Sequence, residues 1–323
     1  MPLLSPRRLL STPDGDPNLP NSRIRVRRFA GPSGYVGRLD HVRIAHLTDI
    51  HVGRVTPFHV QRQAVALANA ERPDLVVITG DFVCHSQIYL DQLTALMRQF
   101  TAPVLTVLGN HDYWAGAGEV RHALIRGGAE VLSNQHTTVT IRNQALQVLG
   151  LDDAYTGHAR REEALRGLRR DVPTLGLSHI AEEADGLWPH DIPLVLAGHT
   201  HGGQVTLARL HEIALGRIAG HKYVHGLYGS RTPKGSNAPQ GAVYVGAGIG
   251  AAIMPLRLGE RGKRELTIFE LGQSPGTFDE HHAEQPALLG RKPPPWLIQK
   301  RNAQVARKRE ARARKRTREV ESK

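Results

Sequence analysis

Residues 74–81 carry the sequence Asp74-Leu75-Val76-Val77-Ile78-Thr79-Gly80-Asp81. A continuous β-branched run that ends in glycine and aspartate is typical of a strand buried on both faces. On either side, residues 59–71 fit a helix that follows a strand at 42–48, and a helix at about 87–100 leads to a strand at 104–108. Strand, helix, strand, helix, strand indicates parallel βαβ units, so we expect an α/β fold.

The second half of the chain is richer in strands than the first. We expect a helix near 159–169 and strands at 137–142, 145–150, 173–178, 193–197, 242–246 and 266–270. Residues 1–41 are rich in proline, glycine and arginine without periodicity and predict a basic N-terminal arm. Residues 272–295 predict a linker, and residues 296–323 favour a basic, helical tail. The folded domain is therefore expected at 42–271.

The net charge of +12 is concentrated at the two ends of the chain. Residues 291–323 contain thirteen basic and three acidic residues, and residues 1–43 contain eight arginines and three aspartates, which leaves a net charge of −3 for the body. Three alternatives stay open for the basic tail. It binds nucleic acid by counterion release, it lies on an anionic membrane surface, or it is a solvated, partly helical extension.

Cysteine usage and hydropathy restrict the class of protein. Cys84 is the only cysteine, which excludes an intramolecular disulfide and predicts no disulfide-linked partner. No stretch approaches the roughly 18 apolar residues that a membrane span needs. Residues 11–17, which follow Arg7 and Arg8, are too polar for the apolar core of an export signal. We therefore expect a cytoplasmic protein, with peripheral attachment to a membrane as the alternative.

Short motifs with metal-ligand chemistry follow the ends of predicted strands, where α/β sheets place their ligands. They are Asp49-Ile50-His51, Gly80-Asp81, Gly109-Asn110-His111-Asp112, Ser178-His179 and Gly198-His199-Thr200-His201. Alternate residues of an extended segment point to the same side, so a pair such as Asp49 and His51 can converge on one ion. Carboxylate, imidazole and amide ligands without a thiolate suit manganese, iron or zinc.

Seven ligand-type residues exceed what one ion usually takes, which favours two divalent ions that share a carboxylate. Two such ions can clamp the attacking and leaving oxygens of an in-line phosphoryl displacement. Each motif alone is weak evidence, because aspartate and asparagine also cap helices. The tetrapeptide at 109–112, in order with the other motifs, is a much more specific signal.

In these motifs the sequence resembles the calcineurin-like metallophosphoesterase family over residues 42–271. The resemblance implies a four-layer αββα sandwich, to which this chain adds basic terminal extensions. It implies that one metal is held by Asp49, His51 and His201, the other by Asn110, His179 and His199, and that Asp81 bridges the two. It also implies that a hydroxide between the ions attacks phosphorus while His111 protonates the leaving oxygen.

A narrower resemblance is to a phosphodiesterase subgroup, some of whose members act on UDP-2,3-diacylglucosamine in lipid A synthesis. The matching segments are 199–204, 223–228 and 243–250, followed by Pro255 and Arg257. The subgroup often has arginine where Ala247 stands here. Arg257 is expected either to hold a substrate phosphate through its two-pronged guanidinium or to form a surface ion pair.

The resemblance departs at Cys84, three residues after Asp81. Many family members have an aspartate there, which orients the catalytic histidine. A thiol is a poor substitute for a carboxylate in fixing an imidazole tautomer. Either another acid such as Asp112 takes this role, or His111 is a weaker acid catalyst than usual.

The sequence therefore predicts a dinuclear metal-dependent phosphoesterase that hydrolyses a phosphodiester or pyrophosphate bond. The alternatives are a phosphomonoesterase or nuclease on the same fold, and a binding protein with a vestigial metal site that is recruited by its basic tail. Substrate specificity is expected in the loops between Gln204 and Gln240 and around Tyr113, with Trp114 as a candidate lining residue. No residue pattern names the substrate.

Overall fold

The computed structural model describes residues 24–203, 220–232, 241–251, 257, 262–280, 283–287 and 303. These residues form two six-stranded sheets. The first sheet has the order β1 (Arg25–Ala30), β12 (Glu265–Leu271), β2 (Val42–Leu47), β3 (Leu75–Thr79), β4 (Val104–Val107) and β5 (Ala129–Val131). The second has the order β10 (Gly226–Gly229), β11 (Ala242–Val245), β9 (Leu194–Ala197), β8 (Thr174–Leu177), β7 (Gln144–Gly150) and β6 (Gln135–Ile141).

Most neighbouring strands are parallel, as the alternation of strands and helices predicts. The antiparallel pairs are β12 with β2, β10 with β11, and β6 with β7. In the centre of the first sheet, β2, β3 and β4 run in the same direction, so their carboxyl ends lie at one edge. In the second sheet, β7, β8 and β9 are likewise parallel.

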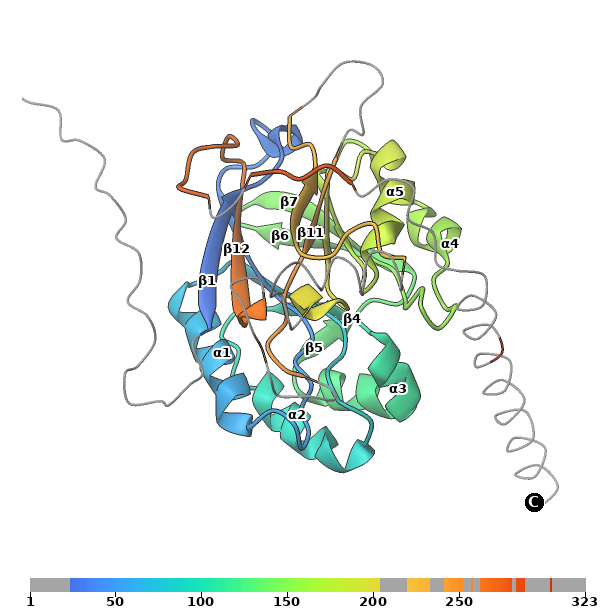
Figure 1. Cartoon of the computed structure of the whole chain (residues 1–323). Helices are drawn as coiled ribbons and strands as arrows, with labels where there is room; N and C mark the ends of the chain where they lie inside the picture. Colours follow the sequence, from blue (N-terminus) through green and yellow to red (C-terminus); the bar gives the residue numbers. More distant parts are fainter. Residues whose placement is uncertain are drawn as a thin grey trace, which may run out of the picture.

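Helices cover the outer face of each sheet (Figure 1). The first sheet is covered by α1 (Phe58–Ala70), α2 (Leu90–Met97) and α3 (Asn110–Arg126). The second is covered by α4 (Arg161–Leu165) and α5 (Ala184–Leu187). Short 3-10 turns complete the connections: η1 (Ser33–Tyr35), η2 (Gln87–Tyr89), η3 (Ala181–Glu183), η4 (Trp188–His190) and η5 (His201–Gly203).

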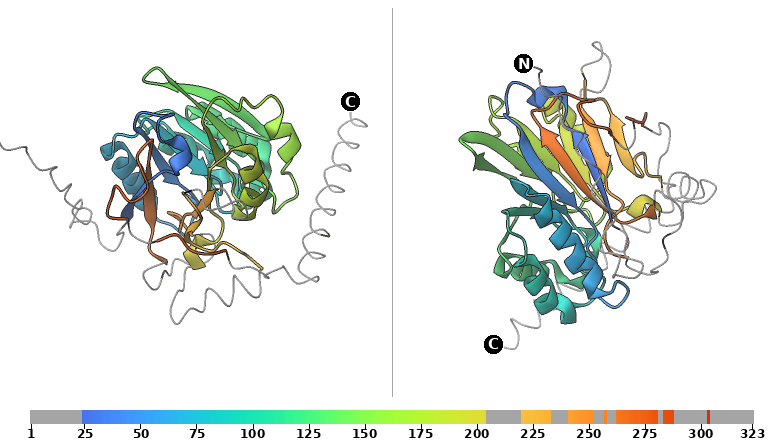
Figure 2. Two further views of the ribbon diagram at one scale, coloured as in Figure 1. Left: turned by 90° about the horizontal axis from the view of Figure 1, so that it is seen from above. Right: turned by 90° about the vertical axis from the view of Figure 1, so that its left-hand side faces the viewer.

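Three apolar clusters separate four layers of secondary structure. One lies between α1–α3 and the first sheet, one between the two sheets, and one between the second sheet and α4 and α5 (Figure 2). Strand β2 shows how the period of two builds this arrangement, because Val42 and Ile44 face the other sheet while Ala45 and Leu47 face the helices. The expected four-layer αββα sandwich is confirmed.

The expected N-terminal arm needs a correction, because its second half is part of the first sheet. Strand β1 pairs in parallel with β12. Arg27 donates to Glu265 at 2.7 Å, and Arg28 pairs with Glu270 at 2.5 Å, so these two arginines of β1 are neutralised within the fold. The folded unit therefore begins before residue 42, and residues 1–23 lie outside the described residues.

The expected linker at 272–295 also needs a correction over its described part. Arg231 forms ion pairs with Glu280, at 2.5 Å, and with Glu284, at 3.0 Å. The backbone N–H of Gln285 donates to the carbonyl oxygen of Leu227 in β10 at 2.8 Å. These contacts attach the segment to the second sheet.

Two expectations fall largely on residues that the structure does not describe. They concern the basic tail at 296–323, where only Ala303 is described, and most of the specificity loops between Gln204 and Gln240. Over the described part of the chain, no helix is both long enough and apolar enough to cross a membrane.

Candidate metal centre

Both sheets contribute side chains to one site at the carboxyl ends of their parallel strands. From the first sheet, Asp49 and His51 follow β2, Asp81 follows β3, and the start of α3 follows β4. From the second sheet, His179 follows β8, and His199 and His201 follow β9. The strand-end rule thus accounts for the position of every predicted ligand.

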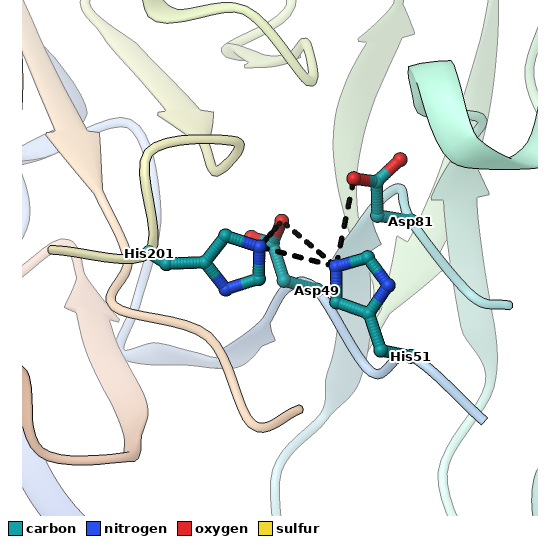
Figure 3. A group of neighbouring side chains, drawn as sticks. All are labelled: Asp49, His51, Asp81 and His201. Carbon is teal, nitrogen blue, oxygen red and sulfur yellow. Dashed lines mark hydrogen bonds and ion pairs between the residues drawn. The ribbon is translucent and has the colours of Figure 1, made fainter. Parts of the chain in front are cut away.

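The first ligand group consists of Asp49, His51, Asp81 and His201, whose ligand atoms all lie within 4.8 Å of one another (Figure 3). The Nε2 atoms of His51 and His201 are 3.1 Å apart. Nε2 of His201 lies 3.3 Å from Oδ1 of Asp49, and Nε2 of His51 lies 3.6 Å from Oδ2 of Asp81. Four donor atoms from three loops, those after β2, β3 and β9, therefore converge on one point.

The second ligand group consists of Asp81, His179 and His199, again within 4.8 Å. Nε2 of His179 lies 3.4 Å from Oδ2 of Asp81 and 3.2 Å from Nδ1 of His199. The side-chain oxygen of Asn110 is 3.2 Å from the same Nε2 atom. Asp81 belongs to both groups, which is the position that the sequence analysis expects for it.

The protonation states of the first group fit a divalent cation. Burial lowers the pKa of His51 and of His201 to about 3, so both rings are neutral and each can offer a nitrogen lone pair. Oδ1 of Asp49 is buried and has no hydrogen-bond partner, although a buried carboxylate oxygen normally has one. Neutral imidazoles and an orphaned carboxylate oxygen are ligands that manganese, iron and zinc accept.

In the second group, the carboxylate of Asp81 favours a protonated His179. Burial lowers the pKa of His179, but the carboxylate of Asp81 outweighs burial and raises this pKa to about 10. The other ring nitrogen, Nδ1, donates to the carbonyl oxygen of Thr79 at 2.7 Å, which directs Nε2 toward Asp81. A divalent cation bound here would therefore displace a proton from Nε2 of His179.

Asp112 holds the loops that carry the ligands in place. Its carboxylate accepts the backbone N–H groups of Asp81 and Gly109, each at 2.9 Å, and of Phe82 and Val83 at 2.8 and 3.2 Å. Gly109 is required at its position, because a Cβ atom there would lie 2.3 Å from Oδ1 of Asp81. The turn after β4 therefore packs directly against the turn after β3.

The ligand loops have an unusual backbone conformation. Asp49, His51, Asp81, His199 and His201 all have positive φ angles, between 46° and 75°. A side chain with a Cβ atom is rarely placed in this left-handed region, and the cost is on the order of 1 kcal/mol or more per residue. Such strain persists only where the surrounding structure determines the conformation.

His111 lies at the edge of both groups. Its Nε2 atom is 4.0 Å from Oδ2 of Asp81, and its ring is 4.8 Å from the ring of His51. It belongs to neither ligand group, and its side chain is partly accessible, so its position suits a proton donor beside the metal ligands.

Comparison with known proteins agrees with this geometry. Residues 42–203 match the family described as calcineurin-like phosphoesterase. The chain belongs to the calcineurin-like phosphoesterase family. It is therefore a metal-dependent phosphoester hydrolase, as the sequence analysis expects.

Relatives of this phosphoesterase carry general names. This chain is 28% identical over 238 residues to a Bacillus subtilis protein named uncharacterized metallophosphoesterase YkuE, and the match covers 72% of this chain and 79% of that protein. It is 28% identical over 239 residues to Escherichia coli phosphodiesterase YaeI, covering 71% and 82%. A Danio rerio protein named transmembrane protein with metallophosphoesterase domain is 29% identical over 262 residues, covering 73% of this chain and 54% of that protein. None of these names specifies the diacylglucosamine subgroup.

The phosphoesterase orients His111 without the expected carboxylate. The Nδ1 atom of His111 lies 2.6 Å from the backbone carbonyl oxygen of Cys84. Asp112 makes its hydrogen bonds to backbone N–H groups instead, so the alternative in which Asp112 orients His111 is wrong. Burial raises the pKa of the Cys84 thiol to about 11, and a protonated thiol is neither a metal ligand nor a nucleophile.

Arg257 occupies neither of its two expected environments. Its guanidinium donates to the carbonyl oxygens of Ala247, Gly250 and Gly262, and one of its nitrogens is 3.5 Å from Nδ1 of His201. It is half-buried, and burial lowers its pKa to about 10. Arg257 therefore supports the loop beside His201, rather than forming a surface ion pair or reaching out to a phosphate.

Aromatic side chains near the site fall into two sets. Trp114 contacts the ring of His111, with centroids 4.7 Å apart, whereas Tyr113 stacks on His158 at 4.0 Å. Tyr155, which the sequence analysis does not single out, contacts His199 at 5.0 Å. Its signal in the sequence is its position five residues after the end of β7 at Gly150, because the same strand-end rule locates the metal ligands.

Proposed function

We propose that this protein is a dinuclear metal-dependent phosphodiesterase or pyrophosphatase. The observation that carries the proposal is Asp81, because its carboxylate belongs to both groups of candidate ligands. A shared carboxylate is the usual way to hold two ions close together. Divalent ions in such a pair polarise the phosphoryl oxygens and neutralise the charge that develops during in-line displacement.

The protein side chains have separate roles in this proposal. Asp49, His51 and His201 would hold one ion, and His179, His199 and Asn110 the other, each directed by the loop that carries it. The partly accessible His111 would contact the phosphate and donate the proton from Nε2 to the leaving oxygen. Its other nitrogen is engaged by the carbonyl oxygen of Cys84, which leaves Nε2 facing the site.

The preference for a diester or pyrophosphate rests on the relatives and on the motif pattern. One relative is named a phosphodiesterase. The alternatives from the sequence, a phosphomonoesterase, a nuclease and a binding protein recruited by its basic tail, are separated from the proposal by activity on defined esters.

The test compares bis-p-nitrophenyl phosphate, a diester, with p-nitrophenyl phosphate, a monoester, in the presence of manganese. We expect faster hydrolysis of the diester and loss of this activity in Asp81→Asn. Asp91→Asn is the matched control, because Asp91 is exposed and pairs with the exposed side chain of Arg126 at 3.5 Å. A preference for the monoester would favour a phosphomonoesterase. Equal inactivity of the wild type and Asp81→Asn, with nucleic acid still bound, would favour a binding protein.

A further inference from the structure

A continuous line of aromatic rings connects the proton donor with the second ligand group. The ring of Trp114 lies 4.7 Å from that of His111 and 6.1 Å from that of Tyr155, and the ring of Tyr155 lies 5.0 Å from that of His199. We call these four side chains the ring arc. Its two ends are a candidate catalytic residue and a candidate metal ligand, so its middle borders the place where a phosphate ester would react.

The ring arc is assembled from three separate segments. Trp114 lies in the first turns of α3, Tyr155 in the loop between β7 and α4, and His199 directly after β9. Trp114 and Tyr155 are both half-buried, so part of each residue is accessible to solvent. Neither residue is a candidate metal ligand, which leaves their role unexplained by the metal centre.

The rings of the arc meet at an angle instead of lying face to face. The interplanar angles are 60° between His111 and Trp114, 78° between Trp114 and Tyr155, and 48° between Tyr155 and His199. Such inclined pairs form a curved aromatic wall. Electron-rich tryptophan and tyrosine rings bind flat aromatic groups by stacking or by edge-to-face contact.

A phosphate held at the metal ligands would place its ester substituent beside this wall. We infer that Trp114 and Tyr155 bind a planar aromatic ring carried by the phosphate ester, either an aryl group or a nucleobase. The inference rests on the proposed function, and it adds the substrate class. The ring arc selects esters with a flat substituent over esters with an alkyl or sugar substituent of similar reach.

The test measures binding of three non-hydrolysable probes to the manganese-loaded protein by calorimetry. The probes are phenylphosphonate, cyclohexylphosphonate and methylphosphonate, which share the phosphonate and differ in the flatness and size of the substituent. We expect phenylphosphonate to bind about tenfold more tightly than methylphosphonate, because one aromatic stacking contact usually strengthens binding by about this factor. Cyclohexylphosphonate, which is apolar but not flat, is expected to bind less tightly than phenylphosphonate.

Variants assign this preference to the ring arc. Trp114→Leu and Tyr155→Leu are each expected to reduce the preference for phenylphosphonate severalfold without changing the affinity for methylphosphonate. Trp114→Phe keeps an aromatic ring and is expected to keep most of the preference. Tyr113→Leu is the matched control, because the adjacent Tyr113 ring stacks on His158 outside the arc. Thermal melting and manganese content check that each variant is folded and loaded.

A second pair of probes distinguishes the two sources of the ring. Adenosine 5′-monophosphate and ribose 5-phosphate differ by the nucleobase alone. Tighter binding of the nucleotide, lost in Tyr155→Leu or Trp114→Leu, assigns a nucleobase. A gain for phenylphosphonate without a gain for the nucleotide assigns an aryl ester.

The outcomes separate this inference from the proposed function. A wild-type protein that hydrolyses diesters but binds the three phosphonates equally overturns the aromatic subsite and leaves the proposed function intact. Retention of the phenyl preference in both leucine variants also overturns it. A protein that prefers phenylphosphonate through Trp114 and Tyr155 but hydrolyses no phosphate ester supports the subsite and contradicts the proposed function.

Discussion

His111 donates a hydrogen bond from Nδ1 to the backbone carbonyl oxygen of Cys84, at 2.6 Å. A carbonyl oxygen can only accept, so this contact fixes the ring tautomer and its orientation without any side chain at position 84. The thiol of Cys84 points elsewhere, toward the carbonyl oxygens of His51 and Ala251 at 3.7 and 3.6 Å. The backbone thus performs the positioning that a carboxylate performs in many relatives of this family.

Substitution at position 84 tests this arrangement. We expect Cys84→Ala and Cys84→Ser to keep kcat on a soluble diester within about threefold, since neither changes the carbonyl oxygen that holds His111. Cys84→Asp is expected to lower stability, because a carboxylate would face two carbonyl oxygens in a buried position. A hundredfold loss of kcat in Cys84→Ala at unchanged manganese content would show that the thiol itself positions His111.

Removal of the His111 side chain separates proton donation from metal binding. His111→Ala is expected to lower kcat by about 10²–10⁴-fold, the usual contribution of a general acid. Its manganese content should equal that of the wild type, because His111 belongs to neither ligand group. Plasma mass spectrometry of the purified variant checks this, and loss of both ions would make His111 a structural residue instead.

The two ligand groups predict how metal content divides among variants. Asp49→Ala removes a ligand from the first group alone and His199→Ala from the second alone, so each is expected to retain about one manganese ion per chain where the wild type holds about two. Asp81→Ala removes a ligand from both groups and is expected to bind neither ion tightly. Equal metal content in all three variants would contradict the sharing of Asp81.

A buried acid away from the metal ligands predicts a pH dependence of stability. Glu265 accepts hydrogen bonds from Arg27, Tyr244 and the backbone N–H of Ala247, at 2.7 to 3.0 Å, and pairs with His225 at 3.0 Å. Burial raises the pKa of Glu265, but His225 and Arg27 outweigh burial and hold this pKa well below its usual range. A depressed carboxyl pKa stabilises the fold above the unfolded-state pKa, and this stability is lost as the pH falls through the folded-state pKa.

Glu265→Gln therefore should lower the free energy of unfolding by about 3 kcal/mol at pH 7, since it leaves buried Arg27 without its carboxylate. The difference from the wild type should shrink as the pH falls below about 4. Urea unfolding of both proteins at pH 7 and pH 3 measures this. Glu130→Gln, at an exposed position of β5, is the control and should match the wild type at both pH values.

Local patterns were sufficient to predict most of the fold. The apolar run at 74–79 and its flanking segments correspond to β3, β2 and β4, and the expected strands of the second half correspond to β6–β9, β11 and β12. Strand β1 could not be recognised, because Arg27 and Arg28 are neutralised by Glu265 and Glu270, more than 200 residues away. A strand that depends on such distant partners has no local signature.

The sequence predicts the parts of the candidate site that depend on side-chain identity. It does not predict the parts that depend on backbone atoms. The residues of the ligand groups follow predicted strand ends, and the structure brings them together as the sequence analysis expects. The partner of His111 is a main-chain oxygen, which every residue type supplies, so the identity of Cys84 carries no information about it. The role of Asp112 is hidden for the same reason, because its partners are backbone N–H groups.

The five left-handed residues of the ligand loops set stability against activity. At Asp49, His51, Asp81, His199 and His201, glycine would adopt the observed backbone without strain, but it would also delete a donor atom. A library randomised at these positions and selected only for heat resistance in a chelator should therefore accumulate glycine and yield inert proteins. Selection for turnover should restore the original residues. Mutations that stabilise these loops are therefore expected to cost activity.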